Sequence, residues 1–195
     1  MKIVTHIALF LFRSFILSAF FLSKSNAQNN LEFSVKTSDN HSIDLSKAIT
    51  QNKATVFVFL MPDCPLCEYY TASLKKLQKQ YAPKKIYFYV VFAGTLFSKK
   101  EIDLFLTQNK MNFTTIYDNE KRLARILGAT VTPQAVIISS NFKRLYTGKI
   151  DNWMTADRQH RTTVTDFYLS DALRNIVANK SVAITYTEPI GCFIP

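Results

Sequence analysis

The chain has 195 residues, of which 48% are hydrophobic and 13% aromatic, so it can bury the core of one folded domain. The formal net charge is +10, but the basic residues are scattered rather than interleaved with aromatic residues in a dense stripe, which argues against a nucleic-acid-binding surface. Three cysteines are too few for a scaffold held together by disulfides, and four glycines include no glycine-rich phosphate loop.

Residues 1–27 have the pattern of a secretory signal peptide. Lys2 and Arg13 precede an apolar run over 14–22, and Ser25-Asn26-Ala27 has the small-x-small form of a cleavage site. We expect cleavage after Ala27, which leaves a domain over residues 28–180 and a C-terminal tail over 181–195. The alternative is a retained N-terminal membrane anchor. Export predicts an oxidising location, either the periplasm or the extracellular space.

Residues 31–45 alternate between apolar and polar side chains around the polar turn at 38–41. This pattern predicts a β-hairpin placed before the core of the domain.

The stretch 54–67, ATVFVFLMPDCPLC, joins a buried strand to a helix. The apolar run ends at Met61, and from Leu66 on the apolar residues recur every three or four positions, at Leu66, Tyr70, Leu74, Leu77 and Tyr81. Pro65 suits the first helical position, where an N–H group is not needed. Two cysteines, Cys64 and Cys67, therefore fall on the first turn of a helix.

That position favours thiol chemistry. The unpaired N–H groups and the positive end of the helix dipole stabilise a thiolate, which is the reactive form of cysteine. Cys64 would attack a partner disulfide, and Cys67, one turn later, would resolve the mixed disulfide. The alternatives are a metal-binding CxxC and a purely structural disulfide.

The following residues predict alternating strands and helices. A continuous apolar run at 85–93 predicts a second buried strand parallel to the first. Ser98 and Glu101 form a capping box that opens a helix. A short extended piece at 113–117 leads to Asp118, which is expected to cap a helix that stops at Gly128.

The last part of the domain is expected to be a β-hairpin and a helix. The strand at 135–139 should pair with 145–150, and the helix should cover about 164–179 with Val164 on its apolar face. Residues 151–163 have no apolar period and predict a loop.

This order of elements, together with four short motifs, resembles the thioredoxin-like superfamily, and within it the redoxin branch shared by secreted thiol–disulfide oxidoreductases and alkyl-hydroperoxide-reductase-like (AhpC/TSA-type) proteins. The motifs are Cys64-Pro65-Leu66-Cys67, Leu127-Gly128-Ala129, Thr132-Pro133 and Tyr146-x-Gly148-x-Ile150-Asp151. The resemblance covers roughly residues 31–180. It implies a three-layer α/β sandwich with a central mixed sheet, and a cis Pro133 packed beside the cysteine pair.

Three departures from related families bear on function. Peroxiredoxins have a threonine three residues before the reactive cysteine and a proline seven before it, where this chain has Met61 and Phe57. The resemblance therefore predicts against peroxidase activity. Thioredoxin has a buried aspartate six residues before its first cysteine, where this chain has Val58.

Two regions outside the motif are expected to border the redox site. Topology places the loop 151–163 there, and its Trp153, Arg158 and His160 suit the binding of a peptide or small disulfide; a plain surface loop is the alternative. The tail is long enough, at up to about 40 Å when extended, to bring Cys192 to Cys64. Cys192 is then either a third thiol in a relay or a small buried anchor.

The sequence thus predicts an enzyme, an exported thiol–disulfide oxidoreductase whose catalytic residues are Cys64, Cys67 and Pro133, with Thr132, Trp153 and Arg158 binding substrate. It needs no cofactor beyond its redox-active disulfide, and no metal site is expected. The partners are protein thiols or disulfides and an unidentified electron donor, and the protein is expected to be a monomer that is not inserted in a membrane. The alternatives are a copper-handling or partner-binding module that uses the thiols without redox turnover, and a thiol peroxidase.

Overall fold

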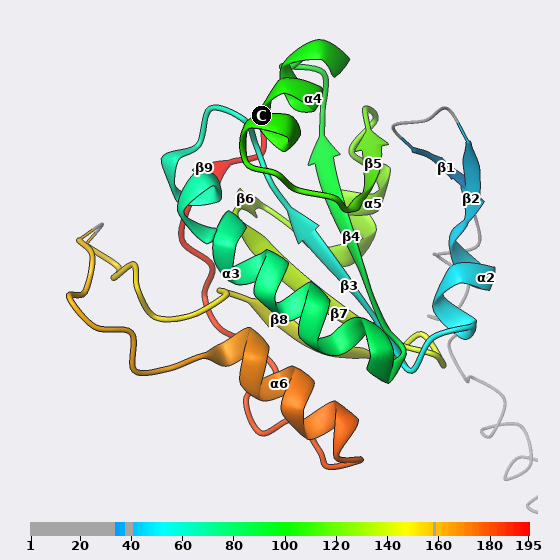
Figure 1. Ribbon diagram of the computed structural model, residues 1–195, viewed down its shortest axis with the longest axis vertical. Helices are drawn as coiled ribbons and strands as arrows, with labels where there is room; N and C mark the ends of the chain where they lie inside the picture. The colour runs from blue at the N-terminus through cyan, green and yellow to red at the C-terminus, as the bar shows by residue number, and fades with distance from the viewer. Residues whose placement is uncertain (1–33, 38–40, 158) are drawn as a thin grey trace, which may run out of the picture.

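The computed structural model describes residues 34–37, 41–157 and 159–195 (Figure 1). The predicted signal peptide and Arg158 lie outside these residues. At the centre is a five-stranded mixed sheet, whose strand order is β5-β4-β3-β7-β8. Its strands are β3 (Ala54–Phe59), β4 (Ile86–Ala93), β5 (Thr114–Asp118), β7 (Gln134–Ser139) and β8 (Arg144–Gly148). Strands β3, β4 and β5 are parallel, whereas β7 is antiparallel to both β3 and β8.

The alternation of side chains along the buried strands produces the three layers. In β3, Val56 and Val58 belong to the core on one face of the sheet, and Phe57 and Phe59 belong to the core on the other. Residues of α3 (Pro65–Tyr81), α4 (Lys99–Gln108) and α6 (Tyr168–Val177) cover the first face. Residues of α2 (Leu45–Thr50) and α5 (Arg122–Leu127) cover the second. The predicted three-layer sandwich is confirmed.

The N-terminal hairpin is also confirmed. Strands β1 (Ser34–Lys36) and β2 (Ser42–Asp44) pair antiparallel, with Val35 opposite Ile43. The helix α2 that follows was not expected from the sequence. Its first residue, Leu45, had been assigned to the hairpin, but Asp44 accepts a hydrogen bond from the Lys47 N–H and starts a helix there.

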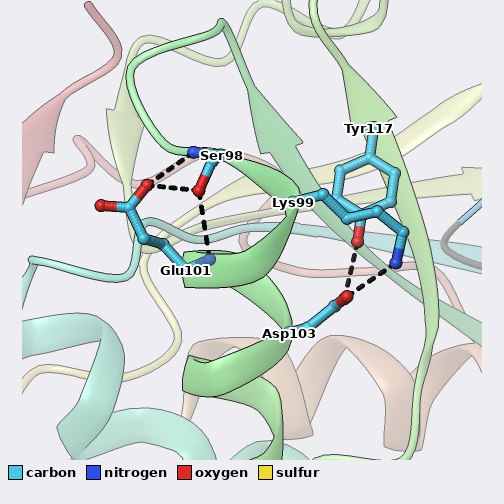
Figure 2. Close-up of polar contacts among 5 residues, drawn as sticks. All are labelled: Ser98, Lys99, Glu101, Asp103 and Tyr117. Atoms are coloured by element: carbon cyan, nitrogen blue, oxygen red, sulfur yellow. Dashed lines mark hydrogen bonds and ion pairs between the residues drawn. The ribbon is translucent and has the colours of Figure 1, made fainter.

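Local hydrogen bonds set the ends of the helices after β4. The capping box of Ser98 and Glu101 begins α4, as predicted (Figure 2). Asp103, one turn further on, accepts hydrogen bonds from Lys99 and from the Tyr117 hydroxyl, which ties the helix to β5. The carboxylate of Asp118 accepts from the N–H groups of Leu123 and Ala124, so it does cap α5, although it lies three residues before the N-cap position.

The helix α6 is shorter than expected at its N-terminus. Val164 lies in a segment without regular secondary structure, and the helix begins only at Tyr168. The reason is the buried Asn152, whose side chain accepts from the Thr165 N–H and donates to the Thr165 hydroxyl, while its N–H donates to the Asp166 carbonyl. These bonds hold residues 165–166 against the loop and outside the helix.

Two short strands complete the described fold. Strand β6 (Val131–Thr132) pairs antiparallel with β9 (Cys192–Phe193), which lies almost at the end of the chain. A 3₁₀ turn, η1 (Ala82–Lys84), follows α3. Within the described ranges, none of the helices combines the length and apolar character that a bilayer crossing requires.

Candidate redox site

The site is built where β3 ends and α3 begins. Cys64 is the N-cap residue of α3, Pro65 occupies the first turn, and Cys67 lies at the third helical position. The N–H groups of Cys67 and Glu68 both donate to the Cys64 carbonyl, which fixes the turn between the cysteines. The side chain of Cys64 makes no capping bond. Because Cys64 is the N-cap residue, its sulfur lies at the helix N-terminus, where a thiolate is stabilised.

Cys64 is joined by a disulfide to Cys192, with the two Cα atoms 6.3 Å apart, and Cys67 is a free thiol. The structure thus brings all three cysteines of the chain to one place. The bonded pair is not the predicted Cys64–Cys67 pair but Cys64 with the tail. Cys192 is thus close enough to Cys64 to serve as a third thiol, and its role as a relay thiol or as an anchor of the tail stays a prediction.

The backbone of Thr132 and Pro133 lies directly beside the disulfide. Their peptide bond is cis, and the Thr132 carbonyl oxygen lies 3.3 Å from the Cys64 sulfur. The Thr132 hydroxyl donates to the Cys192 carbonyl at 3.3 Å. Thr132 therefore contacts both cysteines of the disulfide.

Cys67 lies beneath this surface, with none of its area exposed. The N–H of Met61 donates to its sulfur at 3.4 Å. Burial raises the pKa of the Cys67 thiol to about 12, against the lowering effect of the hydrogen bonds from Met61 and Thr132. Cys64 is also covered, with 1% exposed. In this disulfide form, then, greater exposure does not distinguish Cys64 from Cys67.

Gln134 was not identified from the sequence, although it shapes the site. It is 2% exposed, and its side-chain carbonyl accepts from the N–H groups of Thr130 and Val131. Its amide donates to the Gly128 carbonyl and the Thr147 hydroxyl. These bonds hold the loop before Pro133 in position. The available signal was a polar residue at the start of an otherwise apolar strand, next to the proline.

The tail is fixed at a second place before it reaches the disulfide. The Thr147 N–H donates to the Thr185 carbonyl, and the Thr187 N–H donates to the Thr147 carbonyl. The Thr187 hydroxyl is within hydrogen-bond distance of the Tyr146 hydroxyl and accepts from the Lys149 N–H, both at 2.8 Å. A Cβ atom on Gly148 would lie 2.9 Å from the Thr187 nitrogen, so this close approach requires glycine. The tail, drawn in orange to red in Figure 1, therefore follows the outer edge of β8 before it reaches β6.

The loop after Ile150 lies against the redox helix. Asp151 accepts a 2.5 Å hydrogen bond from the Tyr70 hydroxyl. Burial, together with this hydrogen bond, raises the pKa of Tyr70. The Trp153 indole stacks on the Tyr69 ring, with the ring centroids 3.6 Å apart. The His160 ring also stacks on the Trp153 indole, with the centroids 5.2 Å apart. The structure thus places Trp153 and His160 beside the start of α3. The third predicted loop residue, Arg158, is not among the described residues.

Across the part of the chain that the structure describes, no group of three or more His, Cys, Asp or Glu side chains is arranged to hold a metal ion.

Comparison with known proteins identifies the fold and the family. The chain matches a hypothetical protein from Sinorhizobium meliloti 1021 with a TM-score of 0.73 and 19% identity, covering 83% of this chain and 89% of that one. It also matches a secreted Mycobacterium tuberculosis disulfide oxidoreductase homologous to E. coli DsbE, with a TM-score of 0.56 and 17% identity over 77% and 98% of the two chains. StoA from Bacillus subtilis matches with a TM-score of 0.51 and 16% identity over 59% and 84%.

At these identities the likeness establishes a thioredoxin-like fold. No curated protein matches the chain. The sequence model of the AhpC/TSA family matches residues 27–152, which is more than half of the chain. With its thioredoxin-like fold and this match, the chain belongs to the AhpC/TSA family.

Proposed function

We propose that this protein is an exported thiol–disulfide oxidoreductase that exchanges disulfides with partner proteins through Cys64 and Cys67. One observation carries the proposal: Cys64, at the N-cap of α3, is joined to a second cysteine while Cys67 stays free one turn away. The sulfur of Cys64 is thus in the bonded state that a mixed disulfide with a partner would have. Cys67 is the neighbouring thiol that could resolve it.

In the reducing direction, the Cys64 thiolate attacks one sulfur of a partner disulfide. A bond forms between Cys64 and that sulfur, and the other partner sulfur leaves as a thiolate and takes up a proton. Cys67 loses its proton and attacks the Cys64 sulfur, which releases the second partner thiol and leaves a Cys64–Cys67 disulfide. The partner gains two electrons and two protons. The protein supplies both electrons and the Cys67 proton, and the solvent supplies the second proton, which it received when the Cys64 thiolate formed. Oxidation of a partner is the same sequence in reverse, and an external donor or acceptor of electrons restores the starting state.

The residues around the cysteines supply the binding surface in this proposal. Thr132 and Pro133 offer a main-chain edge next to Cys64, and Trp153, with Tyr69 and His160, offers an aromatic stack beside the first turns of α3. Arg158 belongs to the same loop in the sequence. Cys192 would be the third thiol, taking the disulfide from Cys64 when no partner is bound.

Peroxidase activity, which the family also includes, is the weaker proposal. The positions that carry a proline and a threonine in peroxiredoxins are Phe57, buried in the core on one face of the sheet, and Met61, which packs against the core on the other face. Neither side chain has a hydroxyl group that could hold a peroxide. Location outside the cytoplasm is proposed from the signal-peptide pattern of residues 1–27, and the division into residues 28–180 and a tail rests on the same sequence argument.

The test is to trap the mixed disulfide. In a Cys67→Ser, Cys192→Ser protein, Cys64 is the only thiol, and partners captured by it cannot be released by the protein's own cysteines. We expect disulfide-linked complexes that disappear on reduction. The matched Cys64→Ser, Cys192→Ser protein, in which Cys67 is the only thiol, should trap none because Cys67 is buried. Equal trapping by the two proteins would refute the assigned roles.

A further inference from the structure

The edge of β6 is occupied by the tail in a way that resembles a bound peptide. Cys192 is the direct partner of Thr132 in the antiparallel pair β6–β9, and the Ile194 N–H donates to the Thr130 carbonyl at 3.0 Å. The Thr132 hydroxyl donates to the Cys192 carbonyl. All of these contacts use main-chain atoms of residues 192–194. Any extended segment could make them, which is the basis of strand addition to a sheet edge.

The edge restricts the residue that precedes the cysteine of the tail. A Cβ atom on Gly191 would overlap the Thr132 carbonyl oxygen, and it would lie 2.6 Å from the Thr132 carbonyl carbon and 3.2 Å from the Pro133 nitrogen. The residue before the cysteine must therefore be glycine for the chain to lie this close. The residue after it, Phe193, is 74% exposed, so the edge sets no comparable limit there.

The tail also takes the place that a partner's cysteine needs. Cys64 is 1% exposed and its sulfur is bonded to Cys192, so a partner's cysteine can reach it only after the tail has left. Cys67 can release the tail without any outside electrons. Its thiolate attacks the Cys64 sulfur, the Cys64–Cys67 bond forms, the Cys64–Cys192 bond breaks, and Cys192 takes up the proton that Cys67 lost.

We propose that residues 191–194 are an internal copy of the segment that the protein recognises in its partners. The partner segment is an extended stretch of protein with glycine directly before its cysteine, and it pairs with the β6 edge in place of the tail. This inference rests on the proposed exchange function and names the substrate class for the same site.

The first experiment measures the glycine requirement. The full-length Cys67→Ser, Cys192→Ser protein is mixed with a peptide of residues 187–195 whose cysteine carries thionitrobenzoate as a mixed disulfide. Cys64 attacks the peptide sulfur, the peptide–Cys64 bond forms, and coloured thionitrobenzoate is released. A second peptide has alanine in place of the glycine, and both rates are divided by the rates with free glutathione. We expect the glycine peptide to react about tenfold faster, a factor equivalent to about 1.4 kcal/mol. Equal normalised rates would overturn the proposal.

The second experiment asks whether the tail competes with the peptide. Adding Gly191→Ala to the same protein should keep the tail off the β6 edge and speed the reaction with the glycine peptide several-fold. The matched control is Glu188→Ala, which changes an exposed residue of the same tail and should leave the rate unchanged. The competition is disproved when Gly191→Ala gives no acceleration, or when Glu188→Ala gives the same one.

A small aromatic disulfide, dithionitrobenzoate, separates this proposal from the exchange function. Because this reagent has no main chain that could pair with the β6 edge, its reaction with Cys64 does not depend on the recognition of glycine. Normal reaction with dithionitrobenzoate but no preference for the glycine peptide would overturn the recognition proposal alone. No reaction of Cys64 with dithionitrobenzoate in any of the variants would overturn the exchange function as well.

Discussion

The central sheet and the C-terminal tail are held in place by different forces. In β3 every residue is buried, and Phe57 and Val58 have no exposed area. In the tail, Ile184, Tyr186 and Phe193 are 50%, 56% and 74% exposed. The sheet is therefore held by the burial of apolar side chains, whereas the tail is held mainly by hydrogen bonds and one disulfide. The difference teaches that a change of redox state can free the tail while the core stays folded.

The largest effect is expected where burial is complete. Leu74, on α3, has no exposed area, and Leu74→Ala should lower the free energy of unfolding by about 2–5 kcal/mol because it leaves a cavity in the core. Urea denaturation measures this loss. The control is Leu104→Ala on α4, whose side chain is 54% exposed and whose replacement should cost no more than about 0.5 kcal/mol. Similar losses in the two variants would contradict the burial argument.

The disulfide should contribute the next largest amount, and only in the oxidised protein. Cys64 and Cys192 are 128 residues apart in sequence, so reduction of the bond should lower the free energy of unfolding by about 2–4 kcal/mol through the freedom gained by the unfolded chain. The measurement compares oxidised with reduced protein in urea. In Cys192→Ser most of this difference should vanish, because a Cys64–Cys67 bond closes only a very short loop. If the oxidised and reduced forms of Cys192→Ser still differ by the same free energy of unfolding, the Cys64–Cys192 bond is not the source of the stabilisation.

The smallest effect concerns the buried thiol under the tail. The Cys67 pKa is raised by burial from 9.0 to about 12, so between these values the unfolded chain loses a proton that the folded protein keeps. Loss of that proton stabilises the unfolded state, and the stability due to Cys67 should fall as pH rises above 9, by about 1 kcal/mol per pH unit. Below pH 9 the thiol is protonated in both states and contributes no pH dependence.

The measurement uses reduced Cys64→Ser, Cys192→Ser protein, compared with the same protein carrying Cys67→Ser as well. Subtracting the two urea-denaturation profiles removes the titration of lysines and tyrosines. A flat difference from about pH 9 to about pH 10.5 would show that the buried thiol ionises at its ordinary pKa.

The sequence predicted the elements whose residues repeat with a clear period, because burial on one face fixes them. The strand at 54–59, the helix after Cys64 and the parallel strand at 86–93 follow directly from apolar runs and Pro65. The start of α6 could not be predicted, since Val164 has the right spacing but the bonds from Asn152 hold residues 165–166 outside the helix. Tertiary hydrogen bonds of this kind leave no periodic signal.

The site was predictable in its parts more than in its connections. The junction of strand and helix placed Cys64 and Cys67, and the chain length showed that Cys192 could reach them. Val182, Ile184 and Tyr186 alternate with polar or small residues, as in an extended strap, but Ile184 and Tyr186 are largely exposed, so burial of this apolar set does not hold the tail. The tail can approach the domain this closely because Gly148 and Gly191 have no side chain at the two contacts. The sequence shows the glycines, but it does not show which residues lie against them.

The stack of Tyr69, Trp153 and His160 gives the protein a built-in optical reporter. Trp153 is the only tryptophan among the 195 residues, so all of the indole fluorescence comes from this one side chain. Its ring centroid lies 3.6 Å from that of Tyr69, a residue two positions after Cys67. Movement of the loop away from α3 would unstack the indole from its neighbours and change its emission. Stopped-flow fluorescence of the unlabelled protein can therefore follow events at the start of the redox helix in real time.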